Sequence, residues 1–220
     1  MRVLDLMSPP HRRNGSSRIS RTQNRLTSDD VTLERPEPDV KNVVVTVKLE
    51  CEPININRLS RILPFSSYDR TRFAAVTIRL LQPSSTVLLF CSGKLVVTGA
   101  ASCEDALLSA YHIVDILKET HPGQNFFLVS YEIQNIVSSL EIPIGKNQVL
   151  DIQAFYRDHA AECTFQRSMF PGLVYRSKIA KPIVLLCFSS ARIVITGAGS
   201  LDNISKTWAM LWPTIRRYIV

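Results

Sequence analysis

The sequence predicts an α+β fold built from two similar halves, each an antiparallel sheet that helices cover on one face only. Three observations lead to this prediction. The segment "KLVVTGA" at Lys94 returns as "RIVITGA" at Arg192, the strands around both segments are apolar on both faces, and each half offers only two helical segments. A repeat period of about 95 residues is too long for a solenoid unit and indicates duplication with pseudo-twofold symmetry.

The repeat covers most of the chain. The segment "NVVVTV" at Asn42 matches "NIVSSL" at Asn135, "RFAAVTIR" matches "MFPGLVYR", and "VLLFCSGKLVVTGA" matches "VLLCFSSARIVITGA". We therefore expect a first repeat at residues 41–122 and a second at residues 123–220. Residues 1–40 are rich in Pro, Ser and Arg and show no sustained hydrophobic period, which predicts a disordered basic and polar tail.

Each half is predicted to run from a short strand at the Asn through a helix and a run of strands to a closing helix. In the first half "SCEDALLSAYHIVDILKETHPG" places Ser102 as N-cap, and the helix should end before Pro122. Its apolar stripe is predicted to comprise Ala106, Ala110, Ile113 and Leu117. The counterpart "SLDNISKTWAMLWPTIRRYI" is less regular, and Pro213 should kink or end it.

The strands pose a problem of coverage. Side chains alternate between the faces of a strand, so Thr86, Leu88 and Phe90 share one face while Val87, Leu89 and Cys91 share the other. Strands that are apolar on both faces usually belong to a parallel sheet between two helical layers. Here the helices are too few for two layers. One apolar face should stay uncovered, and such a face usually has a partner.

Composition narrows the class of partner. The chain has 220 residues, 45% of them apolar, with a formal net charge of +7, which favours nucleic acid or an acidic membrane surface. No apolar run is long enough to span a membrane, and charge and prolines break the opening "MRVLDLMSPPHRR". We expect an intracellular protein. Its cysteines, Cys51, Cys91, Cys103, Cys163 and Cys187, are expected to be reduced core thiols.

A DNA minor groove would fit the uncovered face. The amide donors of Asn42 and Asn135 could use the acceptors on the floor of the groove at A·T pairs, whereas the amino group of guanine would obstruct a closely packed apolar surface. We expect the basic side chains that flank these strands to contact phosphates, which would make affinity fall steeply with salt. They are Arg72, Arg79, Lys94, Arg176 and Arg192.

Five blocks resemble the TATA-box-binding protein family over about residues 41–220, and most of them have a counterpart in the other half of the chain. They are "RFAAV" at Arg72, "LLF" with "SGK" at Leu88, "QNIV" at Gln134, "FPGLVYR" at Phe170, and "TGA" at Thr98 and Thr196. The resemblance implies a saddle of two repeats, a curved antiparallel sheet with helices on the convex face only and the concave face on the minor groove of A·T-rich DNA. It also implies a general transcription initiation factor of the nucleus, which kinks promoter DNA and nucleates assembly of the preinitiation complex. Its partners would be double-stranded DNA, general transcription factors and the RNA polymerase machinery, with a homodimer possible when DNA is absent.

The resemblance also assigns roles to residues. The intercalating phenylalanines would be Phe73, Phe90, Phe170 and Phe188. The contacts to base edges and to the groove floor would come from Asn42, Asn135, Thr98, Thr196, Val44, Val96, Val137, Val194, Leu88 and Leu186. Phe73 and Phe170 stand outside the regular apolar runs, each beside a small or rigid neighbour, which is typical of a loop tip.

The chain departs from the family pattern in several places. Gln166, Arg167 and Ser168 stand where the family has an acidic loop before the second wedge, so the partner contact of that loop is in question. Ala101 and Gly199 replace a lysine after each "TGA", and about four extra residues lie between Asn135 and Phe170. These departures indicate a divergent member or a related factor.

Two other classes of protein fit the sequence less well. An enzyme is not expected, because "SGK" lacks the glycine that a phosphate-binding loop needs at the position of Leu88, and "HAAEC" at His159 lacks the second half of a metal site. We expect neither a metal nor another cofactor. The alternative is a saddle-shaped scaffold with weak or no TATA binding. The four phenylalanines argue against it, since a scaffold has no reason to keep wedges at all four places.

Overall fold

A computed structural model of the protein describes residues 34–178 and 183–220. The expected tail, residues 1–40, lies outside the described residues as far as residue 33. In chain order the elements are β1 (Asp39–Glu50), α1 (Ile56–Ile62), β2 (Ser66–Ser67), β3 (Ala75–Leu81), β4 (Ser84–Phe90), β5 (Lys94–Ala100), α2 (Cys103–Thr120), β6 (Phe127–Glu141), α3 (Ile152–Asp158), β7 (Cys163–Thr164), β8 (Leu173–Arg176), β9 (Val184–Cys187), β10 (Arg192–Ala198), α4 (Leu201–Ile215) and the 3-10 helix η1 (Arg216–Tyr218).

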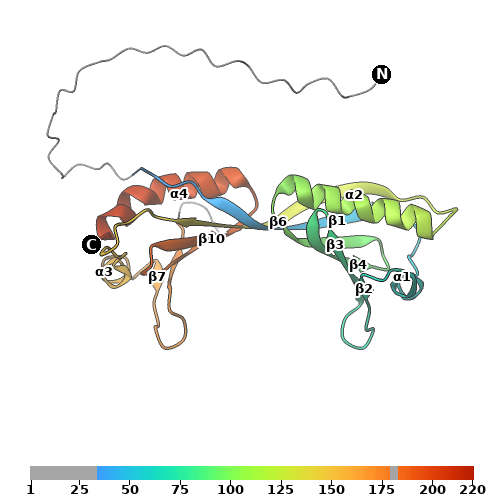
Figure 1. Cartoon of the computed structure of the whole chain (residues 1–220), viewed down its shortest axis with the longest axis horizontal. Helices are drawn as coiled ribbons and strands as arrows, with labels where there is room; N and C mark the ends of the chain where they lie inside the picture. Colours follow the sequence, from blue (N-terminus) through green and yellow to red (C-terminus); the bar gives the residue numbers. More distant parts are fainter. Residues whose placement is uncertain (1–33, 179–182) are drawn as a thin grey trace, which may run out of the picture. The chain divides into compact units, whose positions relative to one another are not determined.

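One antiparallel sheet of ten strands organises the described chain, in the order β2-β3-β4-β5-β1-β6-β10-β9-β8-β7. This order is symmetric about the β1–β6 pair, so each half runs from a two-residue edge strand to a long central strand. Helices α2 and α4 lie on the same side of the sheet, and the loops that follow β2 and β7 project to the other side (Figure 1). The predicted α+β fold with helices on one face is confirmed.

The predicted alternation of faces positions the core. In β4 the side chains of Val87 and Leu89 are fully buried under the helices, whereas those of Thr86, Leu88 and Phe90 are only half-buried. Strands β5 and β10 repeat the pattern, with buried Leu95 and Val97 and with buried Ile193 and Ile195. The face opposite the helices therefore remains uncovered, as predicted.

The cysteine prediction is only partly correct. All five thiols are free, but only Cys187 is buried. Cys91, predicted on the covered face of β4, lies one residue beyond that strand in the turn to β5 and is exposed. The alternation ends with the strand, so the sequence pattern no longer decides which way Cys91 points.

The closing helices share one design. Ser102 caps α2 by accepting a hydrogen bond from the Asp105 backbone N–H at 3.0 Å, and the predicted stripe is fully buried. Ser200 caps α4 in the same way. Pro213 does not end α4, which continues to Ile215. Proline removes one donor and adds a clash, but Trp212 and Ile215 on either side are buried and hold this last turn in place. No helix in the described chain is long and apolar enough to span a membrane.

The central strands are longer than the predicted short strands at the two asparagines. β1 and β6 pair from Asp39 with Ser139 to Glu50 with Phe127, and this pairing joins the two repeats. The extra residues of the second repeat lie mostly between β6 and α3. There Val149 exchanges backbone hydrogen bonds with Val220, at 2.8 and 3.0 Å, so the extra segment fixes the end of the chain.

Candidate nucleic-acid interface

The centre of the uncovered face is a patch of two asparagines and two valines. Asn42 lies opposite Val137 and Val44 lies opposite Asn135 in the β1–β6 pair, so the patch has the twofold symmetry of the repeat. All four side chains are half-buried, although their strand neighbours, such as Val43, are fully buried under the helices. The predicted central residues of both repeats are therefore brought together.

Rows of apolar side chains extend from this patch in both directions. In the first repeat Leu88 pairs with Val96 and Thr86 with Thr98. In the second, Leu186 pairs with Val194 and Val184 with Thr196. Cross-strand partners point to the same face, so each predicted valine, leucine and threonine lies on the uncovered face. Together they form a continuous floor with hydroxyl groups at matched points.

A pair of phenylalanines stands at each end of this floor. The ring centroids of Phe73 and Phe90 are 5.7 Å apart with planes at 66°, and those of Phe170 and Phe188 are 5.7 Å apart at 65°. Both pairs are in the edge-to-face arrangement that aromatic rings favour. Phe73 lies in the loop before β3 and Phe170 in the loop before β8, and Phe73 is 47% exposed. Each loop is held at its base, since the N–H of Phe73 donates to the Asp69 carbonyl and that of Phe170 to the Gln166 carbonyl.

Both asparagines are held by backbone donors. The N–H of Gly99 donates to Asn42 Oδ1 at 2.7 Å, and the N–H of Gly197 donates to Asn135 Oδ1 at 2.8 Å. In the second repeat Asn135 Nδ2 also donates to Thr196 Oγ1 at 3.2 Å. The amide oxygens are thus occupied within the protein. The amide nitrogens are the groups available to a partner on the uncovered face.

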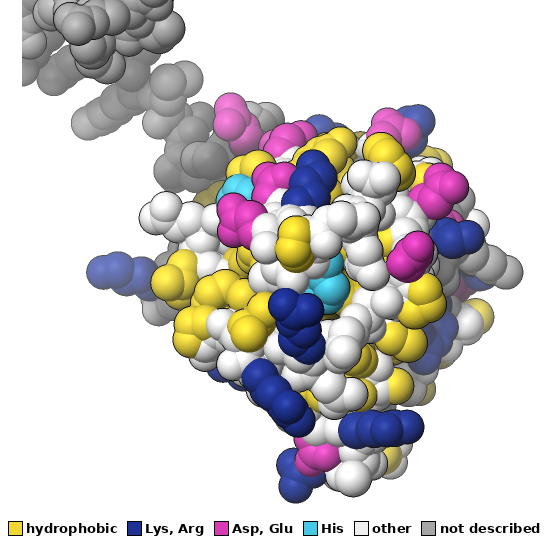
Figure 2. Space-filling view, turned by 90° about the vertical axis from the view of Figure 1, so that its right-hand side faces the viewer, with side chains coloured by type: hydrophobic (Ala, Val, Ile, Leu, Met, Phe, Trp, Pro, Cys, Tyr) yellow, Lys and Arg dark blue, Asp and Glu magenta, His cyan; other side chains and the backbone are white. Residues whose placement is uncertain are grey.

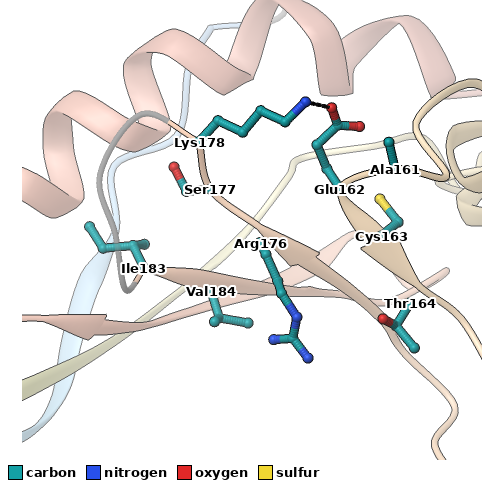
Figure 3. A pocket seen from close by; sticks show the side chains of 9 residues that line it. All are labelled: Ala161, Glu162, Cys163, Thr164, Arg176, Ser177, Lys178, Ile183 and Val184. Carbon is teal, nitrogen blue, oxygen red and sulfur yellow. Dashed lines mark hydrogen bonds and ion pairs between the residues drawn. The ribbon is translucent and has the colours of Figure 1, made fainter.

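The five basic residues that are predicted to contact phosphates differ in where they lie and in whether an acidic side chain is close to them. Arg79 and Lys94 are exposed on the floor side of β3 and β5. Figure 3 shows Arg176 on the side of β8 that faces away from α4, as its pairing with Val184 requires. Arg192 lies 3.8 Å from Glu141. Arg72 is 86% exposed and lies 3.4 Å from Asp69, in the loop that carries Phe73.

Arg176 also lines the pocket drawn in Figure 3, but the titratable side chains of this pocket are not activated for chemistry. Glu162 and Lys178 form an ion pair on its α4 side. The hydrogen bond from Lys178 lowers the pKa of the Glu162 carboxyl. Burial raises the pKa of Cys163 to about 11, so this thiol stays protonated near neutral pH and is a poor nucleophile.

Sequence reasoning missed some of the charge on and around the floor. Lys48 pairs with Lys94 across β1 and β5 and shares its face, and alternation counted from Asn42 would have found it. The end of the first repeat is basic as well. In Figure 2, Lys and Arg gather in the lower half of this end, whereas Asp and Glu lie mostly above. The exposed arginines of α1 and of the Phe73 loop are Arg58, Arg61, Arg70 and Arg72.

Comparisons with known proteins agree with this geometry. A family model described as transcription factor TFIID, or TATA-binding protein, matches residues 37–120 and 130–218. TATA-box-binding protein 1 of Arabidopsis thaliana is 34% identical over 181 residues, which cover 82% of this chain and 86% of that one. TATA-box-binding protein of Acanthamoeba castellanii is 35% identical over 183 residues, or 82% and 67% of the two chains. The structure of Methanococcus jannaschii TBP matches with a TM-score of 0.68 and 30% identity, covering 83% of this chain and 99% of that one.

Proposed function

The chain belongs to the family of transcription factor TFIID, or TATA-binding protein, and on this premise we propose that it is a general transcription initiation factor that binds A·T-rich promoter DNA in the minor groove. Binding would kink the duplex with inserted phenylalanines and would nucleate assembly of the preinitiation complex in the nucleus. General transcription factors and the RNA polymerase machinery would be its protein partners. We propose no catalytic role and no cofactor.

The two phenylalanine pairs are the observation that carries the proposal. Each pair is only partly covered and stands at one end of an apolar floor, one on either side of the central asparagines. Apolar wedges inserted between base steps unstack and bend a duplex, which costs a few kcal/mol per step and is offset by the larger surface that the bent DNA contacts. Two wedges at each end of one floor suit two kinks at the ends of one bound site.

The central patch supports preference for A·T pairs. Asn42 and Asn135 present amide nitrogens, which can donate to the N3 of adenine and the O2 of thymine. The valines beside them would pack on the floor of the groove, where the exocyclic amino group of guanine would intrude. Lys94, Arg79 and Arg176 border the floor and would contact phosphates. Without DNA, the same apolar floor could be covered by a second copy of the chain.

A titration tests the proposal directly. We would label an A·T-rich duplex and a G·C-rich duplex with a donor and an acceptor at their ends and follow both affinity and end-to-end distance. We expect the protein to bind the A·T-rich duplex more tightly by at least about 10³-fold, within the usual span of specific over non-specific binding, and to shorten the end-to-end distance. Equal affinity for both duplexes would reject the function.

The scaffold alternative makes the opposite prediction for the wedges. Replacing both Phe73 and Phe170 with alanine should abolish bending and leave the fold intact, because these side chains lie in loops and Phe73 is 47% exposed. Thermal unfolding would confirm that the variant is folded. If the unaltered protein fails to bend DNA, or if the variant bends it equally, the phenylalanines are not wedges and the scaffold reading is favoured.

A further inference from the structure

The glycine of the repeated "TGA" segment has no role in the function proposed above. Gly99 has φ +84° and Gly197 has φ +89°. Packing does not demand a glycine at the first position, because a Cβ at Gly99 would lie 3.8 Å from its nearest neighbour, the Ser85 Cα. The backbone conformation does demand it, since other residues rarely adopt positive φ.

This conformation aims a backbone donor at an asparagine. The Gly99 N–H reaches Asn42 Oδ1 at 2.7 Å, and the Gly197 N–H reaches Asn135 Oδ1 at 2.8 Å. A backbone N–H can only donate, so the amide atom that it meets must be the oxygen. The bond therefore decides which way each amide faces.

We propose that Gly99 and Gly197 are positioning residues that fix the amides of Asn42 and Asn135 with the nitrogen toward the DNA. This inference rests on the proposed function. A minor-groove floor at A·T pairs offers only acceptors. An amide turned by 180° would place its own oxygen against them, and a favourable contact would become a repulsive one.

The two repeats differ in how much of the amide is free. One N–H of Asn135 Nδ2 donates to Thr196 Oγ1 at 3.2 Å. Asn42 Nδ2 has no such partner among the residues that the structure describes. Asn42 thus has two donors to offer, and loss of Gly99 should matter more for binding than loss of Gly197.

Amide exchange tests the positioning without DNA. In the unaltered protein the Gly99 amide proton should exchange slowly. It should remain protected in Asn42→Asp, which keeps an acceptor. It should exchange about fivefold faster in Asn42→Ala, where a hydrogen bond that contributes about 1 kcal/mol is lost. Equal exchange in the unaltered protein and Asn42→Ala would overturn the inference, because the bond would not exist in solution.

Base analogues test the consequence for recognition. Replacing a central adenine with 3-deazaadenine removes the N3 acceptor and keeps Watson–Crick pairing. The unaltered protein should lose about tenfold in affinity, as one unpaired donor costs about 1–3 kcal/mol. Gly99→Val should bind the parent duplex about tenfold more weakly and show no further loss on the analogue. Gly99→Asn should recover part of the affinity for the parent duplex and part of the sensitivity to the analogue, since Asn tolerates positive φ.

A matched control separates positioning from general strain. Gly123 has φ +93° and lies in the loop between α2 and β6, with nothing within 4 Å of its would-be Cβ. Gly123→Val should therefore keep the full loss on the analogue. If Gly99→Val does not fold, Gly99→Ala serves in its place and should likewise lose sensitivity to the analogue, since a Cβ there has room and only the positive φ is disfavoured. Retained sensitivity in these variants would overturn the positioning role alone, whereas absence of any A·T preference in the unaltered protein would overturn the proposed function as well.

Discussion

The two repeats share one order of strands and helices but differ in the side chains that fill it. Under the helices the first repeat buries Ala110 where the second buries Trp208. On the uncovered face the phenylalanine pairs keep the same separation, 5.7 Å, in both halves. Packing against the helices can be solved in several ways as long as the total volume is conserved, whereas the phenylalanine pairs keep one geometry in both repeats.

The largest expected effect concerns this difference in packing. Trp208→Ala should lower the free energy of unfolding by about 3–5 kcal/mol, because the side chain is fully buried and its Nε1–H donates to the Pro36 carbonyl at 2.6 Å. The matched change Ala110→Gly should cost only about 1 kcal/mol, the helix-propensity difference. Urea denaturation measures both. Similar losses would mean that the two helices anchor their repeats equally.

A smaller effect is expected beside the second phenylalanine pair. A Cβ added at Gly172 would lie 2.8 Å from Phe170 Cε1 and 2.9 Å from Phe188 Cε1, so Gly172→Ala must displace a ring. A ring pushed off its rotamer costs about 0.5–1.5 kcal/mol, which corresponds to about two- to tenfold in affinity for A·T-rich DNA.

The first repeat supplies the control, because Ala75 already carries a Cβ at the matched position. Ala75→Gly should leave both rings of its pair where they are and change affinity little. If both variants bind like the unaltered protein, the positions of the rings do not limit affinity.

Charge on the floor gives a third contrast. Lys48 lies beside Lys94 in the first repeat, whereas Glu141 lies beside Arg192 in the second. Glu141→Gln should tighten DNA binding and steepen its salt dependence, since it frees Arg192 for a phosphate and each phosphate contact contributes about 0.9 to the slope. Lys48→Gln should make the slope shallower. Affinity measured over a range of salt concentrations checks both, and unchanged slopes would remove these residues from the interface.

The smallest effect concerns pH. His121 caps α2, and Ile219 caps η1 at the matched place. Burial, followed by the nearby Arg58, lowers the pKa of His121 below its ordinary value of 6.5. The folded protein therefore binds this proton more weakly than the unfolded chain. The stabilisation from neutral His121 is complete above pH 6.5 and is lost as pH falls toward the folded pKa.

We expect His121→Phe to reduce the decline of the melting temperature between neutral pH and pH 5. Phenylalanine keeps a ring against Phe126 and carries no titratable group. Thermal unfolding of both proteins at several pH values provides the measurement. An identical pH profile would show that His121 titrates alike in the folded and unfolded chains.

Much of the candidate interface could be predicted because its pattern is local. Alternation along β4 places Leu88 and Phe90 on one face whatever the strand pairs with, and the structure agrees. Cys91 was misjudged because it lies just beyond the end of β4, where the alternation stops and neighbouring contacts decide. Pro213 does not end α4, because the buried residues around it extend the packing of the helix by one more turn. The bond from Gly99 to Asn42 could not be predicted, since it joins two strands far apart in the sequence and depends on a backbone angle.

The sequence by itself determined the duplication, the N-cap of α2 and which side chains share a face of each strand. The duplication appears as a repeat of about 95 residues, and the cap and the shared faces follow from spacings of two to four residues. Only the tertiary structure decided that β1 pairs with β6. This pairing joins the uncovered faces of the two repeats into one surface and places Asn42 and Asn135 in the same patch. The reason is physical. Which face a side chain takes is set by its own strand, but which strand lies beside it is set by hydrogen bonds and packing across the whole sheet.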